Sequence, residues 1–220
     1  MESPTVKSFK LRGTRITAAQ LDARERLWTT YGVDYVDHGI DLEGLFPGRE
    51  KIVAEIGFGM GEATIAIAQS TPNTGFLAID VHKPGIGKVL SVIEDSKIAN
   101  IRVMDEDAHL ILAKMIADES FDGLHLFFPD PWPKSRHHKR RIVNSGFINL
   151  VADKLKEGAT FHIATDWIPY AQSIQEVFAQ SDRYTGGVIE RPEWRPLTRF
   201  ENQGIRKDHE VTDLAYKKIK

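Results

Sequence analysis

The sequence has no cysteine among its 220 residues. This absence excludes disulfide bonds, thiolate catalysis, and zinc or iron–sulfur sites that depend on cysteine. The sequence also lacks an apolar run of the roughly 18 residues that a membrane-spanning helix needs. Its first residues include acidic Glu2 and no continuous apolar segment of the kind found in secretory leaders. We therefore expect a cytoplasmic protein with no membrane association.

Internal repeats, coiled-coil heptads and long low-complexity tracts are absent too, which excludes solenoid and fibrous architectures. With 41% hydrophobic and 27% charged residues, the composition is that of an ordinary globular protein. Residues 1–28 hold six lysines and arginines against three acids, although the whole chain is formally −2. The sequence therefore predicts a basic and partly mobile N-terminal arm (residues 1–28), followed by a single domain (residues 29–220).

Further along the chain, short β-rich segments alternate with longer segments of helical periodicity. This rhythm predicts an α/β fold in which helices cover both faces of a mostly parallel sheet, and two weaker strands near the C-terminus would make the sheet mixed. Gly158 is a candidate helix stop and Asp166 a candidate helix cap. The predicted strands are residues 51–56, 75–80, 101–104, 121–128, 159–165, 184–189 and 211–217. The predicted helices are residues 61–70, 84–97, 108–118, 142–156 and 168–180.

A glycine-rich loop, Glu55-Ile-Gly-Phe-Gly-Met-Gly61, ends the first predicted strand just before a helix. Gly57 and Gly59 would let the backbone approach a ligand at the carboxyl end of the sheet. A dinucleotide-binding loop prefers the pattern G-x-G-x-x-G and places pyrophosphate on the helix N-terminus. Here the pattern is G-x-G-x-G, and Glu55 and Glu62 flank it. Because negative charge repels pyrophosphate and suits a cation, the loop favours S-adenosylmethionine over NAD.

Acids also follow the next three predicted strands: Asp80, Asp107 and Asp130. The carboxyl ends of parallel strands converge on one crevice. There, Asp80 would accept hydrogen bonds from ribose hydroxyls and Asp107 from an adenine amino group. Each acid alone is more often a solvated loop residue or a helix cap, but the set as a whole predicts a shared site.

Asp130 stands between Pro129 and Pro131, whose rings restrict the backbone and fix the position of the carboxylate. A simple turn acid is the alternative interpretation. Seven of the eight residues from 134 to 141 are then Lys, Arg or His. A charge run of this kind is usually a solvated helix face, but its position beside Asp130 favours phosphate binding. The expected phosphate contacts are Lys134, Arg136, Lys139, Arg140 and Arg141.

Two more segments complete the expected site. Asp166 ends the predicted strand 159–165 and stands beside Trp167. Residues 195–201 offer a guanidinium, a hydroxyl, an aromatic ring and a carboxylate, which together suit a purine. An irregular surface loop is the alternative for this segment. His137 and His138 invite a metal interpretation, but no cysteine supports it and we expect no metal.

Together these motifs resemble the bacterial tRNA (guanine-N7)-methyltransferase family over roughly residues 8–216. The resemblance implies a class I S-adenosylmethionine-dependent methyltransferase fold, which is Rossmann-like with a seven-stranded mixed sheet. It also implies an enzyme that transfers a methyl group from S-adenosylmethionine to N7 of a guanine in the variable loop of tRNA. The matching segments are residues 55–61, 127–134, 136–141, 164–167 and 195–201.

The same resemblance assigns roles to individual residues. Asp130 is implied to be the catalytic residue as well as part of the cofactor site. Two departures from the family are Asp80, where some members carry Glu, and the segment 208–214, which lacks a Trp found in the family. The implied cofactor site is Glu55, Gly57, Gly59, Asp80, Asp107 and Asp130. The implied substrate contacts are Lys134, Asp166, Thr198, Arg199, Phe200 and Glu201.

Guanine N7 carries a lone pair and no proton at neutral pH, so its methylation needs no general base. We expect Asp130 to orient the guanine and to stabilise the positive charge that develops on it. An NAD-dependent oxidoreductase and a non-catalytic RNA-binding module are the rival interpretations. Acids at successive strand ends argue against the second rival. We expect no obligatory protein partner, and either a monomer or a homodimer.

Overall fold

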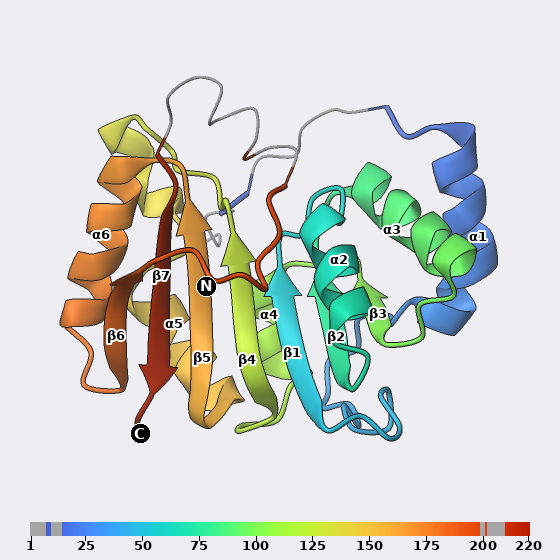
Figure 1. Cartoon of the computed structure of the whole chain (residues 1–220), viewed down its shortest axis with the longest axis horizontal. Helices are drawn as coiled ribbons and strands as arrows, with labels where there is room; N and C mark the ends of the chain where they lie inside the picture. The colour runs from blue at the N-terminus through green and yellow to red at the C-terminus, as the bar shows by residue number, and fades with distance from the viewer. Residues whose placement is uncertain (1–7, 10–14, 199–200, 202–209) are drawn as a thin grey trace.

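The computed structural model describes residues 8–9, 15–198, 201 and 210–220. Seven strands form one sheet in the order β3-β2-β1-β4-β5-β7-β6, with helices on both faces (Figure 1). The strands are β1 Lys51–Ile56, β2 Thr74–Ile79, β3 Ile101–Met104, β4 Phe121–Phe127, β5 Leu155–Thr165, β6 Tyr184–Ile189 and β7 Thr212–Lys218. The helices are α1 Ala18–Tyr31, α2 Glu62–Ser70, α3 Lys83–Ser96, α4 Ala108–Lys114, α5 Ser145–Lys154 and α6 Ile168–Ala179, with a 3₁₀ helix η1 Ser135–Arg140.

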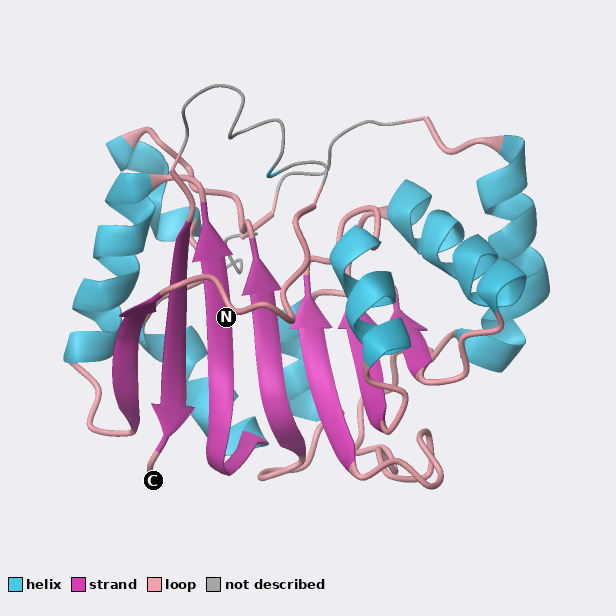
Figure 2. Cartoon of the chain, in the orientation of Figure 1, coloured by secondary structure: helices cyan, strands magenta, loops and turns pink. Residues whose placement is uncertain are grey.

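Parallel pairing fixes where the strand ends lie. β1 pairs in parallel with both β2 and β4, while β2 pairs with β3 and β4 with β5 in the same sense. The arrowheads of these five strands therefore point to one edge of the sheet (Figure 2). β7 is antiparallel to both β5 and β6, which makes the sheet mixed. The strand order reverses between β1 and β4, so the crevice expected for a ligand lies at that switch point.

The core has one layer on each face of the sheet. Leu77, Leu124 and Phe161, each fully buried, face α4, α5 and α6. Val103 and Ala78 face α1, α2 and α3 on the opposite side. Over β4, β5 and β7 on that second face, the segment after β6 crosses the sheet in place of a helix (Figure 1). In the described part of the chain, no helix is both long and apolar enough to cross a bilayer.

The predicted α/β fold is confirmed, but two local predictions are wrong. Gly158 does not stop a helix, because α5 ends at Lys154 and β5 begins at Leu155. Leu155 pairs with Phe121, and the register then shifts, so Gly158 lies in an irregular part of the strand at φ 80°. A glycine suits such a bulge. The N-cap of α6 is Trp167 and not Asp166.

Helix α1 occupies residues 18–28 of the predicted basic arm and extends to Tyr31. Thr17 and Gln20 form a capping box at its start, a signal that is present in the sequence. The helix lies close against α3 at Gly87, where an added Cβ would overlap the carbonyl oxygen of Gln20. The absence of a side chain at Gly87 therefore permits the close approach of the two helices.

Replacing Gly87 with Ala should force α1 and α3 apart. We expect the free energy of unfolding to fall by about 1–3 kcal/mol, the usual cost of overpacking. Urea unfolding measures the change. The matched control is Gly39→Ala, because a Cβ at Gly39 meets no atom within 4 Å. The control should change the stability by less than about 0.5 kcal/mol, and equal effects at the two positions would contradict the packing argument.

Candidate active site

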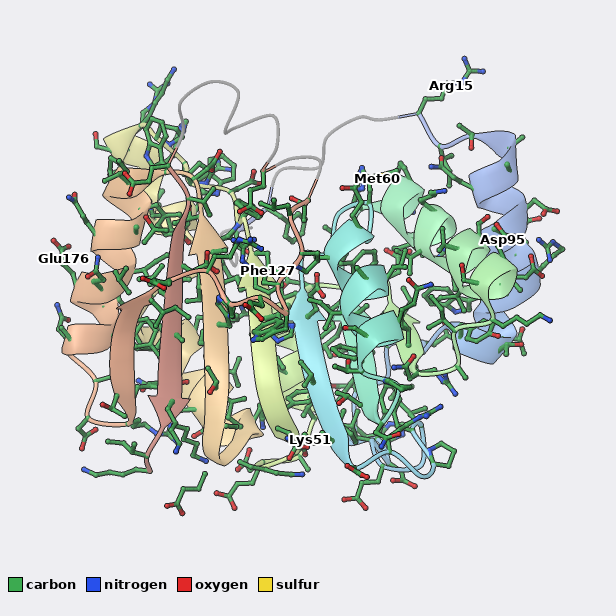
Figure 3. The ribbon with its side chains drawn as sticks, viewed as in Figure 1. Arg15, Lys51, Met60, Asp95, Phe127 and Glu176 are labelled. Carbon is green, nitrogen blue, oxygen red and sulfur yellow. The ribbon has the colours of Figure 1, made fainter. Side chains whose placement is uncertain are left out.

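The glycine loop stands at the carboxyl edge of the sheet, with Met60 at that edge and Lys51 at the opposite one (Figure 3). Gly57 and Gly59 have φ values of 74° and 58°, in the left-handed region that favours glycine. A Cβ added at either would meet no atom within 4 Å, so open space lies before the loop. Behind it, Gly85 of α3 packs so closely that an added Cβ would overlap the carbonyl oxygen of Gly59. The loop is thus closely packed on one side and open on the other.

Glu55, at the end of β1, is a buried carboxyl group. Its side chain is only 2% exposed. Burial raises the pKa of Glu55 to about 7, and the negative charge of Asp80 acts in the same direction. One carboxylate oxygen, Oε2, has no hydrogen-bond partner among the described residues. A buried acid with an unsatisfied oxygen is costly for the fold and suits a cationic ligand that would pair with it.

Asp80 and Asp107 lie at the ends of β2 and β3, as expected. The carboxylate of Asp80 accepts hydrogen bonds from the backbone N–H of Gly59 (2.7 Å) and of His82 (2.9 Å). It thereby ties the glycine loop to β2. Burial raises the pKa of Asp80 above its usual range. Asp107 caps α4 by accepting from the N–H of His109 (2.9 Å).

Backbone strain surrounds Asp130. Phe128 and Trp132 have φ values of 53° and 44°, which are uncommon for side chains of this size. The N–H of Phe128 donates to the carbonyl of Ala164 (2.7 Å), so the turn stays joined to β5. Because β4 and β5 are parallel, Asp130 and Asp166 follow neighbouring strand ends. Strained residues that persist in a fold often mark a functional site.

The indole of Trp132 is half-buried between its own loop and the N-terminal segment. Its Nε1–H donates to the carbonyl of Ser8 (3.0 Å). The guanidinium carbon of Arg140 lies 5.0 Å from the centre of its ring, and His137 meets the ring edge-on. These contacts favour a packing role for Trp132 over stacking on a base.

The basic strip divides into an exposed and a buried part. Lys134, Arg136 and Lys139 are exposed, and Arg140 is partly buried against Trp132. Arg141 is only 7% exposed. This placement of Arg141 differs from the surface contact expected from the sequence. Two neighbouring arginines thus have different surroundings, which charge patterning alone does not distinguish.

The segment after β6 is held by a buried cluster around Arg195, which is 1% exposed. Its guanidinium donates to both oxygens of Glu201 (2.8 and 2.9 Å) and to both oxygens of Asp213 (2.7 and 2.8 Å). His162 donates to the same Asp213 carboxylate (2.8 Å). The sequence predicted that Glu201 would contact the substrate, whereas in the structure its carboxylate pairs with Arg195. Thr198 lies beside the cluster, since its Oγ1 accepts from the N–H of Glu201 (3.1 Å).

Several residues around the site were not singled out from the sequence. Trp194 stacks on His125 of β4, with ring centres 5.0 Å apart. Tyr170 of α6 is fully buried and accepts a hydrogen bond from the N–H of Val143 (3.3 Å). No short motif marks these contacts, because each joins residues far apart in the chain. Arg199 and Phe200 lie outside the described residues. No cluster of His, Asp and Glu suited to a metal ion occurs among the residues that are described.

The raised pKa of Glu55 predicts a dependence of stability on pH. Between about pH 4.5 and 7, the folded protein retains a proton on Glu55 that the unfolded chain has released. The stabilisation is complete below this window and is lost as the pH rises through 7. As the pH rises from about 4.5 to 7, the free energy of unfolding of the wild type should therefore fall by about 3 kcal/mol more than that of Glu55→Gln. Denaturant unfolding at a series of pH values measures this difference, and parallel curves would contradict it.

Comparison with known proteins agrees with this geometry. Residues 49–214 match the model of a family described as putative methyltransferases. A tRNA (guanine-N(7)-)-methyltransferase of Streptomyces avermitilis is 47% identical over 219 residues, covering 97% of this chain and 76% of that protein. The protein of the same name from Neisseria meningitidis serogroup A is 46% identical over 218 residues, covering 98% of this chain and 92% of that protein.

Solved structures show the same fold at low identity. The 16S rRNA methyltransferase KamB superposes with a TM-score of 0.61 at 16% identity, covering 84% of this chain and 97% of that one. A putative methyltransferase from Streptococcus mutans in complex with SAH gives a TM-score of 0.54 at 10% identity, covering 93% and 100%. The fold is that of class I methyltransferases, and by its sequence the chain belongs to the tRNA (guanine-N7)-methyltransferase family.

Proposed function

We propose that this protein transfers the methyl group of S-adenosylmethionine to N7 of a guanine in the variable loop of tRNA, giving 7-methylguanosine. The observation that carries the proposal is buried Glu55 beside an open glycine loop, at the edge that also holds the Asp130 turn. Relatives named tRNA (guanine-N(7)-)-methyltransferase support the choice of substrate. An NAD-dependent oxidoreductase is not favoured, because Glu55 and Asp80 would repel a pyrophosphate. A purely RNA-binding role is not favoured either, because RNA binding does not explain the buried carboxyl group of Glu55.

The residues present fit S-adenosylmethionine, which is a cation without phosphate. Its ammonium group would offset the negative charge at Glu55, and its chain would lie against the open side of Gly57 and Gly59. Asp80 has lone pairs beyond those used by its two backbone N–H partners, and these would accept from ribose hydroxyls. Asp107 would accept from the adenine amino group, and Asp130 closes the cofactor site from β4.

The chemistry is an in-line displacement. The lone pair of guanine N7 forms the new bond to the methyl carbon as the carbon–sulfur bond breaks, and positive charge moves from sulfur to the purine. No proton leaves N7, so the protein's task is to position the reactants and stabilise the charge. Asp130 does both, and Asp166 on the neighbouring strand end holds the substrate. Lys134, Thr198, Arg199 and Phe200 make the remaining substrate contacts, and Glu201 supports this segment through its ion pair with Arg195.

The exposed basic side chains bind the tRNA backbone. Arg136 and Lys139 project from η1 beside the Asp130 turn, and Arg140 lies partly buried behind them. Contacts of this kind orient a nucleic acid without reading its sequence. The reaction needs no second protein, so we propose that a monomer or a homodimer acts in the cytoplasm.

Replacing Asp130 with Asn tests the chemical role of this carboxylate. The assay transfers labelled methyl groups from S-adenosylmethionine to unmodified tRNA and identifies the nucleoside formed. Wild type should yield 7-methylguanosine, and Asp130→Asn should lose turnover by on the order of 10²-fold while still binding S-adenosylmethionine. Asp95→Asn is the control, because Asp95 is an exposed acid of α3. Near-wild-type methylation by the Asp130 variant would reject the assignment, and a different product would reject the proposed function.

Replacing Arg136 and Lys139 together with Ala tests the phosphate contacts. The tRNA dissociation constant should rise, and the slope of log K against log salt should flatten by about 1 for each lost contact. Binding at a series of salt concentrations measures both quantities. Lys51→Ala, at the opposite edge of the sheet (Figure 3), is the control and should leave the slope unchanged. An unchanged slope in the double variant would show that these side chains do not contact phosphate.

A further inference from the structure

We propose that Arg141 is a positioning residue that fixes the Asp130 turn from beneath, and that it does not bind tRNA phosphate. The inference rests on the proposed function, because it concerns how the same site is held. The Nε–H of Arg141 donates to the carbonyl of Pro131 (3.0 Å), the residue next to Asp130. A second guanidinium nitrogen donates to Nε2 of His138 (3.2 Å). The side chain therefore points into the protein and leaves only 7% of the residue exposed.

The carbonyl of Pro131 lies in the strained part of the turn. It belongs to the peptide that leads into Trp132, whose φ is 44°. Phe128, on the other side of Asp130, is held at a φ of 53°. Prolines have no N–H, so Pro129 and Pro131 cannot stabilise this shape by donating hydrogen bonds. A hydrogen bond to the carbonyl of Pro131 is thus a direct means of holding the strained peptide in place.

Tyr170 connects Arg141 to Asp130. The guanidinium carbon of Arg141 lies 4.8 Å from the centre of the Tyr170 ring, within the range of a cation–π contact. Burial raises the pKa of Tyr170 to about 12, and the negative charge of Asp130 acts in the same direction. The phenol oxygen of Tyr170 also accepts from the N–H of Val143 (3.3 Å).

The same tyrosine links the two acidic strand ends. Tyr170 belongs to the first turn of α6, which follows Asp166 directly, and its N–H donates to the carbonyl of Trp167 (2.8 Å). Arg141 thus lies between the turn that carries Asp130 and the helix that follows Asp166. Loss of its planar guanidinium would let the turn move relative to that helix. A shift of about 1 Å in a reacting group can cost roughly 10²-fold in rate.

Lysine distinguishes the two possible roles of Arg141. A lysine ammonium ion binds phosphate as a point charge, but it cannot stack as a plane on Tyr170 while donating sideways to Pro131. If Arg141 positions the turn, Arg141→Lys and Arg141→Ala should both lose kcat by on the order of 10²-fold. Their KM for tRNA and the salt slope of tRNA binding should stay at the wild-type values.

Arg136 supplies the matched comparison, since it is an exposed arginine of the same strip. Arg136→Ala should raise the KM for tRNA and flatten the salt slope, and Arg136→Lys should restore most of the salt slope, because a lysine also binds phosphate as a point charge. The salt slope is a binding measurement and needs no turnover. Melting temperatures show whether each variant is folded at the assay temperature. If Arg141→Ala is unfolded there, the kcat and salt slope of Arg141→Lys test the inference instead.

Wild-type turnover by Arg141→Lys would overturn the inference. A flattened salt slope with unchanged kcat in Arg141→Ala would overturn it too, because phosphate binding would then be the role of this side chain. A failure of the proposed function would look different, because the wild type itself would then transfer no methyl group to N7 of a tRNA guanine.

Discussion

The parallel pairing of β1 with β2 on one side and β4 on the other is the constraint on which the site depends. It places Glu55, Asp80 and Asp130 at one edge, although they are far apart in the sequence. Gathering acids in this way is unfavourable unless each charge is offset. Backbone N–H groups offset Asp80, whereas one oxygen of Glu55 has no partner among the described residues. The arrangement of these acids thus favours a cationic ligand at this edge of the sheet.

A second constraint acts on the face of β4, β5 and β7, which is covered by a segment of irregular backbone. An extended segment buries less apolar surface than a helix, so it needs other anchors. Arg195 supplies them through its ion pairs with Glu201 and Asp213. Removing charges from water is costly, and it is tolerated when the geometry satisfies both partners, as the double contacts do here. The cluster therefore also holds Thr198, whose hydroxyl accepts from the N–H of Glu201.

The parts of this structure that depend on local sequence could be predicted. The bounds of β1, β3 and β6 agree with those predicted from the sequence, and the acids at strand ends follow from the alternation of strands and helices. The long-range contacts could not be predicted. Arg140 and Arg141 are identical neighbours, yet Arg140 packs on Trp132 whereas Arg141 is buried against Tyr170 and Pro131. Similarly, nothing near Arg195 indicates that its partner would be Asp213 on the last strand.

The position of β7 has a consequence for how the chain is made. β7 is synthesised after β5 and β6, yet it lies between them in the sheet. Until it emerges from the ribosome, the nascent protein exposes two unpaired strand edges, which are open to wrong partners. Asp213 lies on β7, so before β7 emerges Arg195 can pair with only one of its two acidic partners. Closure of the sheet and anchoring of the segment after β6 therefore both wait for the same strand.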